Sequence, residues 1–469
     1  MSTVTVDSLA PAAPEVDPDA VRRTYELDRA HVFHSWSAQG ALRPMVVTGA
    51  QGSWLWDGEG RPLLDFSSQL VNTNIGHQHP SVVAAIQRQA ARLCTVAPQH
   101  ANDMRSEAAR LITERAAGDA LNRVFFTNGG AEAIENAVRM ARLHTGRRKV
   151  LARYRSYHGH TQAAIHLTGD PRRWANDTGA EAVVHFFGPY PYRSVFHAST
   201  PEEECERALA HLEQVVQLEG PSTIAAIVLE TIPGTAGIIV PPADYLAGVR
   251  EICDRYGICW IADEVMAGFG RSGAWFSLDH FRTAHGTVPA PDLVTFAKGV
   301  NSGYVPLGGV LLSDAIAETF RERPYPGGLT YSGHPLACAS AVATIEAMAA
   351  EGVVENAARV GAEVLGPGLA DIAQRHPVVG EVRGLGVFWA LELVRDRESR
   401  EPLVPYNATG GAAQPMNDLV AACKRRGLLP FVNMNRLHVV PPCTVSDDEA
   451  RLGLSLLDDA LAELEEGLS

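Results

Sequence analysis

The side chain best suited to covalent chemistry with a carbonyl group is lysine, and this chain has only three, Lys149, Lys298 and Lys424. The other 37 of its 40 Lys and Arg residues are arginines, which cannot lose their proton or form a stable imine in an enzyme. Lys149 and Lys424 lie in basic segments near the ends of expected helices, where a solvated surface position is the simplest interpretation. Lys298 instead follows the mostly apolar residues 293–297, and burial there would lower its pKa and make the amine nucleophilic. The alternative is a lysine whose stem packs at a strand end while its amine reaches solvent.

Three further groups could hold a flat, charged ligand. Asp263 follows the apolar residues 259–262, and a partly buried carboxylate there needs a donor or cationic partner. The alternative is that Asp263 caps a helix or forms an ion pair in a loop. The Gly129-Gly130 turn opens a helix after a short expected strand. Its free amides and the helix dipole could bind a phosphate, and an ordinary strand-to-helix turn is the alternative. Tyr157 follows another expected strand and could stack on a planar ring or pack in the core.

The set of these groups is more specific than any single member. A glycine turn, an aromatic residue, an acid and a lysine follow one another at positions 129–131, 157, 263 and 298. A ring with a phosphate tail, a basic nitrogen and an aldehyde needs these groups, and pyridoxal 5′-phosphate is such a ring. The glycine turn has neither the GxGxxG nor the Walker pattern, which disfavours a dinucleotide or ATP. A non-catalytic nucleotide-binding protein would leave the acid and the lysine unexplained.

These groups can meet only if the strands that precede them are neighbours in one sheet. Between about residues 105 and 320, expected strands and helices alternate, and residues 224–230 are almost wholly apolar. Such segments are typical of parallel strands that are buried on both faces. The alternation predicts an α/β core with a mostly parallel sheet, which would gather the strand ends at one edge.

The character of the sequence changes after about residue 335, where an Ala-rich helix and further strands and helices predict a second, smaller α+β domain. The first part of the chain, rich in Ala and Pro, has the composition of a loose tail. We therefore expect four regions: a flexible tail at 1–20, the N-terminal part of the small domain at 21–75, a large cofactor-binding domain at 76–335, and the C-terminal part of the small domain at 336–469.

The composition is that of a soluble globular protein. Hydrophobic residues make up 46% and charged residues 20% of the 469, and the net charge of −14 argues against nucleic-acid and anionic-membrane partners. The N-terminal segment lacks the basic start and apolar stretch of a secretion signal, and no apolar run approaches the roughly 18 residues of a membrane helix. Seven scattered cysteines without a CxxC motif predict reduced thiols and no metal site. A cytoplasmic location is expected.

The sequence resembles the class III, or omega, aminotransferases of PLP fold type I, over nearly the whole chain from about residue 30. The matching motifs are residues 76–80 (GHQHP), 126–133 (FTNGGAEA), 157–159 (YHG), 263–273 (DEVMAGFGRSG), 291–299 (PDLVTFAKG) and 330–335 (TYSGHP). Residues 34–37 (HSWS) look closest to the branch that uses pyruvate with taurine, β-alanine or simple amines. The resemblance implies a large domain with helices on both faces of its sheet and a small domain formed by the two ends of the chain.

Carried over to this sequence, the resemblance implies a role for each motif residue around pyridoxal phosphate. Lys298 would form the imine with the cofactor and shuttle the proton, and Asp263 would pair with the ring nitrogen. Tyr157 would stack on one ring face and Val265 would cover the other. Glu230 stands where the family places an acid near the cofactor.

The phosphate would be held by main-chain groups of Gly130 and Ala131. Ala131 stands where many relatives have Ser or Thr, so binding would depend more on amides. Thr330 would reach the phosphate in a neighbouring subunit, which implies a homodimer with shared active sites.

The expected substrate pocket departs from the family pattern. The family's mobile arginine for the substrate carboxylate falls at about Phe431, and Arg436, five residues later, could take its place or face solvent. Where amine-accepting relatives carry a Trp, this chain has Val71 beside Leu70, which suggests a more open site.

The resemblance implies a ping-pong transamination from an omega-amino acid or simple amine to an α-keto acid, with pyruvate the expected acceptor. A 2-oxoglutarate-dependent aminotransferase of the GABA or ornithine type is an alternative. A decarboxylase or aminomutase on the same fold is another, because it would share every motif.

Overall fold

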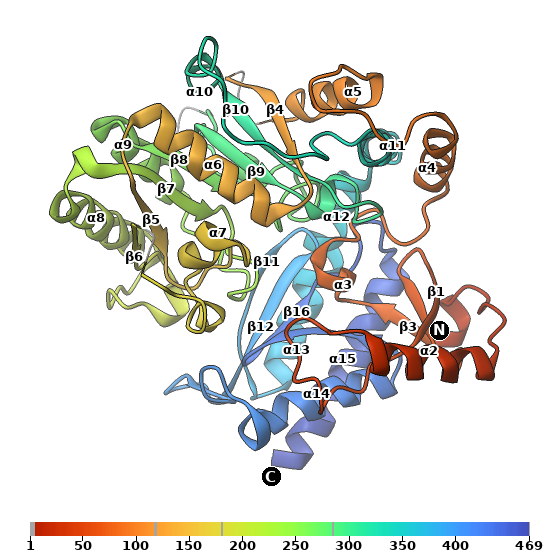
Figure 1. Ribbon diagram of the computed structural model, residues 1–469. Coiled ribbons are helices and arrows are strands. Elements are labelled where there is room, and N and C mark those ends of the chain that lie inside the picture. The colour runs from red at the N-terminus through yellow and green to blue at the C-terminus, as the bar shows by residue number, and fades with distance from the viewer. Residues whose placement is uncertain (1–4, 117–119, 180–181, 284–285, 469) are drawn as a thin grey trace.

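The protein consists of a large unit around a seven-stranded sheet and a smaller unit in which both ends of the chain meet (Figure 1). The computed structural model describes residues 5–116, 120–179, 182–283 and 286–468. Residues 1–4 of the expected tail lie outside these ranges. Within the rest of that tail, helix α1 (Val6–Leu9) packs its two terminal apolar side chains against the core of the smaller unit.

The large sheet has the strand order β4-β10-β9-β8-β7-β5-β6. Strand β10 runs antiparallel to both neighbours, and all other neighbouring pairs are parallel. The strands are β4 (Leu121–Thr127), β5 (Lys149–Arg153), β6 (Val183–Phe186), β7 (Ile224–Glu230), β8 (Cys259–Asp263), β9 (Leu293–Phe296) and β10 (Gly308–Ser313). The prediction of a mostly parallel sheet is confirmed, and the carboxyl ends of β4, β5, β7, β8 and β9 share one edge.

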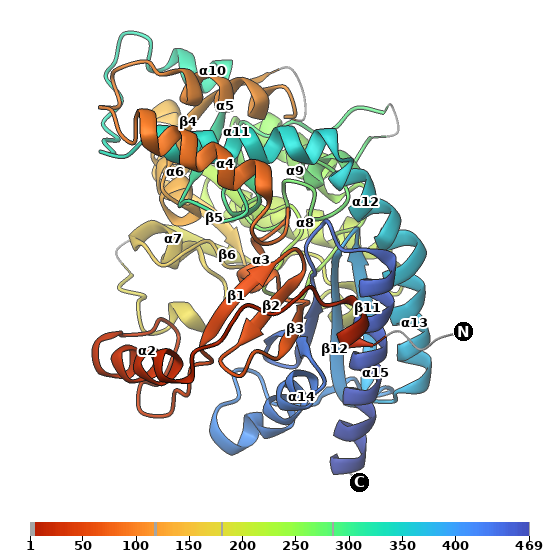
Figure 2. The same cartoon turned by 90° about the vertical axis from the view of Figure 1, so that its right-hand side faces the viewer.

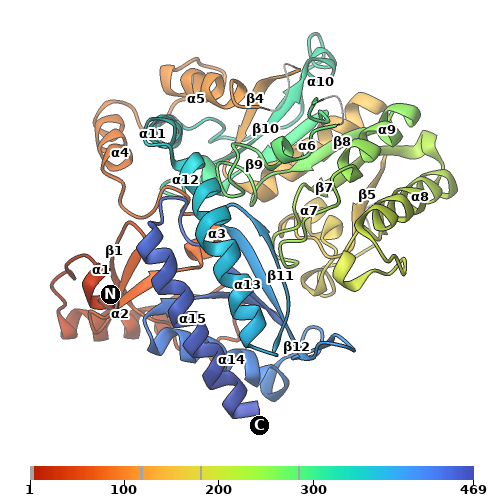
Figure 3. The same ribbon diagram turned by 180° about the vertical axis from the view of Figure 1, so that it is seen from behind.

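Helices cover both faces of this sheet, as expected. Ala226 and Val228 of β7 pack in the apolar cluster of α6, whereas Ile227 and Leu229 pack in that of α8 and α9. Helices α8 and α9 are seen from their outer side in Figure 3. The helices of the large unit are α4 (Pro80–Arg92), α5 (Asp103–Thr113), α6 (Gly130–Thr145), α7 (Gln162–Leu167), α8 (Pro201–Glu219), α9 (Tyr245–Tyr256), α10 (Asp314–Glu318) and α11 (Pro335–Ala350). Because β7 is buried on both faces, its residues 224–229 are all apolar.

The smaller unit joins distant parts of the chain in two sheets, with orders β1-β2-β3-β14 and β11-β12-β16-β15. Strand β14 pairs with β3 across more than 360 residues of sequence, and α13 lies beside α15 (Figures 2 and 3). The strands are β1 (Val47–Gln51), β2 (Trp54–Asp57), β3 (Pro62–Asp65), β11 (Val379–Leu385), β12 (Phe388–Asp396), β13 (Glu401–Pro402), β14 (Leu428–Leu429), β15 (Phe431–Asn433) and β16 (Arg436–Val439). The helices are α2 (Pro18–His31), α3 (Ser68–Val71), α12 (Val353–Val360), α13 (Gly366–Arg375), α14 (Gln414–Arg425) and α15 (Asp447–Leu468). Among the described residues no single helix is long and apolar enough to cross a bilayer, and α11 passes that test only together with residues 353–375, across a bend of 59°.

A fully buried arginine ties the two units together. The Arg271 guanidinium donates to Ser68 Oγ at 3.0 Å, to Asn74 Oδ1 at 2.8 Å and to the carbonyl oxygens of Val387 and Pro441. No carboxylate bonds to it in the described part of the chain, so Nη1 and Nη2 are bound by neutral oxygens alone. The segment before α4 and the loop after β16 are thus joined through one side chain.

Replacing Arg271 with methionine is expected to lower the free energy of unfolding by about 3–5 kcal/mol, because several buried oxygens would lose their donors at about 1–3 kcal/mol each. Urea denaturation of the two proteins at equal concentration measures this difference. The exposed Arg282, which donates to the Gly286 carbonyl oxygen, gives the matched control, Arg282→Met. A loss of less than about 1 kcal/mol for Arg271→Met, the range of an ordinary surface change, would contradict the assignment.

A second polar cluster joins the loop after β6 to strands β11 and β12. Glu392 is 1% exposed and accepts hydrogen bonds from the Tyr190 hydroxyl, from Arg193 Nε and, at 2.9 Å, from Arg383 Nη2. Burial alone would raise the pKa of this carboxyl, but the Arg383 charge and these hydrogen bonds lower it to about 2.

This lowered pKa makes the cluster sensitive to acid. A carboxyl whose pKa drops from 4.5 to about 2 on folding contributes about 3 kcal/mol above its ordinary pKa, and that contribution is lost as the pH falls from about 4.5 toward 2. Glu392→Gln should therefore be clearly less stable than wild type at pH 7, and the difference should shrink at pH 4. Urea denaturation at the two pH values tests this, with the exposed Glu401→Gln as control. A difference that does not change with pH would show that the charge of Glu392 is not the cause.

Candidate active site

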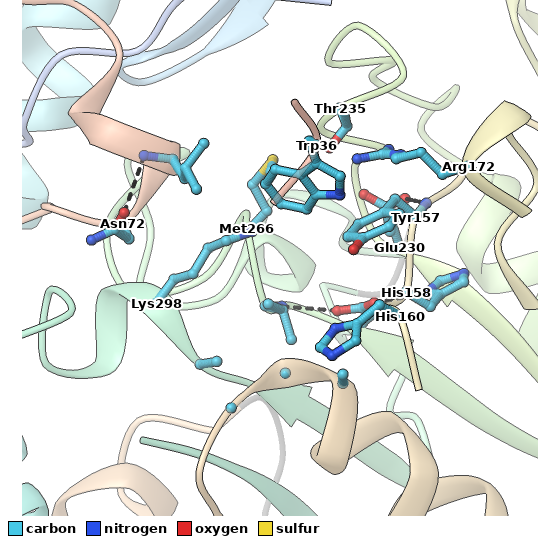
Figure 4. A pocket seen from close by; sticks show the side chains of 18 of the residues that line it. Trp36, Asn72, Tyr157, His158, His160, Arg172, Glu230, Thr235, Met266 and Lys298 are labelled. Atoms are coloured by element: carbon cyan, nitrogen blue, oxygen red, sulfur yellow. Dashed lines mark hydrogen bonds and ion pairs between the residues drawn. The ribbon is translucent and has the colours of Figure 1, made fainter. Parts of the chain in front are cut away.

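A cavity of about 1160 Å³ opens at the carboxyl edge of the large sheet, where the smaller unit meets it. Figure 4 shows side chains from both units converging on it. The lining residues expected from the sequence are Gly130, Ala131, Tyr157, Glu230, Asp263, Val265, Lys298, Leu70 and Phe431. The structure thus brings nine of the twelve expected site residues to one cavity, although they are spread over more than 350 positions of sequence.

Lys298 lies directly after β9, at the start of a short 3-10 helix, Lys298–Val300. Burial lowers the pKa of its amine from the usual 10.5 to about 8, although the negative charges of Asp263 and Glu230 act in the opposite direction. About half of the amine is therefore neutral near pH 8, and only the neutral form attacks a carbonyl carbon. The backbone φ of Lys298 is +43°, a left-handed conformation that costs a residue other than glycine about 1–3 kcal/mol.

Asp263 ends β8 and its carboxylate is held from two sides. Oδ1 accepts a hydrogen bond from the Val265 amide at 3.0 Å, and Oδ2 lies 2.7 Å from His158 Nδ1. Burial disfavours a charged imidazole, but the hydrogen bond and charge of Asp263 outweigh it and keep the pKa of His158 above its ordinary value. A donating His158 orients the Asp263 carboxylate, which suits pairing with a protonated ring nitrogen.

Glu230 ends the neighbouring strand, β7, beside Asp263. Its Oε1 accepts from the Tyr157 amide at 3.0 Å, and its Oε2 accepts from the Gly234 amide at 2.8 Å. Burial raises the pKa of this carboxyl. Glu230 therefore fixes the main chain of Tyr157, so that the loop after β5 holds its aromatic ring over the cavity.

The start of α6 provides a place for a phosphate. No side chain caps this helix, and the first intrahelical hydrogen bond is from Ala133 N to the Gly129 carbonyl oxygen, so the preceding amides of Gly130 and Ala131 have no intrahelical acceptor. A Cβ on Gly130 would lie 2.8 Å from Val265 Cγ1, so the close packing of this turn requires glycine. Uncapped amides and the helix dipole favour a phosphate. The chemistry of this turn, Asp263 and Lys298 fits the phosphate, ring nitrogen and aldehyde of pyridoxal phosphate.

The remaining expected residues lie outside the cavity lining. Thr330 is exposed, and Val71 is 1% exposed within the core, next to the lining residue Leu70. Arg436 is 3% exposed on β16 and approaches Gly237 rather than the cavity. The two other lysines lie elsewhere: Lys149 Nζ pairs with Glu219 at 2.7 Å, and Lys424 is exposed.

Several lining side chains received no role from the sequence. Trp36 is 65% exposed and meets the Tyr157 ring edge-on at 6.3 Å, and Arg172 lies over the same ring at 3.7 Å. His158 could have been suspected from its place beside Tyr157, whereas loop residues such as Arg172 carry no periodic signal. No group of three or more His, Cys, Asp or Glu residues suited to a metal ion occurs in the described ranges.

Comparisons with known proteins agree with this chemistry. A sequence model of the class III aminotransferases matches residues 36–461. The taurine–pyruvate aminotransferase of Rhodobacter capsulatus is 35% identical over 93% of this chain and 96% of its own length, and the putrescine–pyruvate aminotransferase of Pseudomonas aeruginosa is 36% identical over 94% and 96%. The taurine:2-oxoglutarate aminotransferase of Bifidobacterium kashiwanohense, solved with PLP and glutamate, superimposes with a TM-score of 0.91 at 38% identity, covering 97% of this chain and all of that one. The chain therefore belongs to the class III aminotransferases and is a pyridoxal-phosphate-dependent transaminase of PLP fold type I.

Proposed function

We propose that this enzyme transfers the amino group of an omega-amino acid or simple amine to an α-keto acid, with pyruvate the expected acceptor, by a ping-pong mechanism. The observation that carries the proposal is the buried Lys298 amine, with its pKa lowered to about 8, in one cavity with Asp263. The relatives that act with taurine or putrescine and pyruvate support the choice of substrates.

When bound, pyridoxal phosphate supplies an aldehyde carbon and an electron-withdrawing ring. The residues of this chain then have separate tasks. Lys298 Nζ, as a neutral amine, would act first as general base and then as general acid, taking the proton from the donor carbon and delivering it to the carbon that carried the cofactor's aldehyde. The Asp263 carboxylate, held by the Val265 amide and His158, would keep a proton on the ring nitrogen. Tyr157 and Val265, which both line the cavity, would cover the two faces of the ring and exclude water.

The phosphate would be bound by the amides of Gly130 and Ala131 at the start of α6. Thr330, which is exposed in the single chain, would complete the phosphate site of a neighbouring subunit, so the active form would be a homodimer. A cytoplasmic location agrees with seven cysteines that are all unpaired.

The test is a panel of donors and acceptors on the purified holoenzyme. Taurine, β-alanine, putrescine and a simple amine are each combined with pyruvate, 2-oxoglutarate or glyoxylate, and amino product and CO2 are both measured. Amino-group transfer that requires the keto acid and releases no CO2 is expected, with pyruvate the best acceptor. CO2 release without a keto acid would replace the proposal with a decarboxylase.

A second candidate is a 2-oxoglutarate-dependent enzyme, favoured by the similarity to the Bifidobacterium taurine:2-oxoglutarate aminotransferase. The same panel separates the two, because a clear preference for 2-oxoglutarate over pyruvate would overturn the choice of acceptor while leaving the transamination intact.

A further inference from the structure

An omega-amino acid carries an acid group at the end opposite its amine, and that group needs a donor or cation in the wall of the cavity. Two cationic side chains of the lining already have other partners or tasks, since Lys298 lies at the reacting end and His158 is bonded to Asp263. Arg436 is buried away from the lining. Among the described lining residues, Arg172 is the one arginine.

The position of the Arg172 guanidinium is fixed on two sides. Asp170 caps the short 3-10 helix Pro171–Arg173, accepting from the Arg172 amide at 2.9 Å and from its Nε at 3.0 Å. The face of the guanidinium lies over the Tyr157 ring, with 3.7 Å between Cζ and the ring centroid (Figure 4). An ion pair along one edge and an aromatic ring under one face leave little rotational freedom.

One edge of this guanidinium still has donors to offer. Its Nε and Nη2 donate to Asp170, whereas Nη1 donates to none of the residues that the structure describes. A planar group held in place with free N–H donors is suited to the oxygens of a carboxylate or sulfonate.

The charges of the cavity also favour one orientation of the substrate. Asp263 and Glu230 make the sheet end of the cavity acidic, so an incoming acid group is repelled there. The positive charge of Arg172 is near enough to contribute to the lowered pKa of Lys298. An amine attracted toward the acidic end and an acid group attracted toward Arg172 would place the donor with its reacting carbon at Lys298.

We propose that Arg172 determines specificity for acid-bearing donors, its guanidinium binding the carboxylate or sulfonate of an omega-amino acid whose amine faces Lys298. This inference rests on the proposed transaminase function. Arg172 acts in recognition and takes no part in proton transfer.

The experiment follows the donor half-reaction of the holoenzyme in single turnovers, without a keto acid. The donors are β-alanine and taurine, which carry a carboxylate and a sulfonate, and the neutral 1-propylamine. In Arg172→Met, kcat/KM for both acid donors should fall about 10–100-fold more than for propylamine, as the loss of charge-assisted hydrogen bonds implies. Arg172→Lys should recover part of this selectivity. The matched control is Arg173→Met, on the same short helix, because Arg173 pairs with Asp177 and does not line the cavity.

A binding measurement separates recognition from chemistry. Propionate and ethanesulfonate, which have the acid group but no amine, should bind to the wild-type holoenzyme and to Arg173→Met in calorimetry, and about 10–100-fold more weakly to Arg172→Met. If acid and neutral donors lose activity in parallel and the anions still bind Arg172→Met, the inference is overturned, although transamination stands. If the wild type converts no donor but binds the anions through Arg172, the proposed function fails and the anion site remains. If Arg172→Met loses activity with only one of the two acid donors, Arg172 recognises only the acid group of that donor.

Discussion

A Lys298→Ala variant is expected to fold like the wild type and to lose transamination by about 10⁴-fold or more, the upper end of what the loss of a positioned proton-transfer group costs. The loss should be this large because, in the proposed mechanism, one amine both holds the cofactor and moves the proton, and neither other lysine lies at the cavity. Initial rates with the best donor and pyruvate measure the effect. Borohydride reduction followed by mass spectrometry should tag position 298 in the wild type.

The small number of lysines makes this assignment easy to check. Lys149→Ala is the matched control, because Lys149 is bound to Glu219 at the other end of the sheet, and it should retain full activity. A borohydride tag on Lys149 or Lys424, or a Lys298→Ala protein that turns over at a wild-type rate, would remove the basis of the proposed function.

Asp263→Asn should lower kcat by about 10²–10⁴-fold, because the loss of one partner from a buried charge pair costs about 3–5 kcal/mol. The amide keeps the size of the side chain but lacks the negative charge that would hold a proton on the ring nitrogen. It also changes the partner of His158, whose raised pKa depends on this carboxylate. The pH at which the bound chromophore changes should therefore shift along with the rate.

The neighbouring Glu264 provides the control for Asp263. It is buried, but its carboxylate accepts hydrogen bonds from the amides of Ser277 and Leu278 outside the cavity. Glu264→Gln should keep kcat near the wild-type value. If Asp263→Asn were as active as Glu264→Gln, Asp263 would be only a structural residue.

Much of the site could be predicted from sequence because its residues stand at the ends of strands. Asp263 follows a wholly apolar segment and Lys298 a mostly apolar one, and parallel strands that are buried on both faces bring such ends to one edge. The glycine turn before α6 was recognisable for a similar reason, because it stands between a strand and a helix of clear type.

Other features depend on tertiary contacts that leave no local pattern. The antiparallel direction of β10 is set by its partners β4 and β9, not by its own residues. The hairpin β11–β12 turns at Gly386, whose φ is +58°, and its strands find their register through each other. Arg172 belongs to the short 3-10 helix Pro171–Arg173, and the direction of its side chain comes from Asp170 and Tyr157.

The backbone conformation of Lys298 has a consequence for how this enzyme can evolve. At φ of +43°, glycine would be tolerated better than any other residue, by about 1 kcal/mol relative to alanine. Folding alone thus disfavours a lysine at this position, and under the proposed mechanism only selection for catalysis would maintain it. A protein that no longer needed this catalysis would become more heat-stable by replacing the lysine. Lys298→Gly should accordingly melt at a higher temperature than Lys298→Ala.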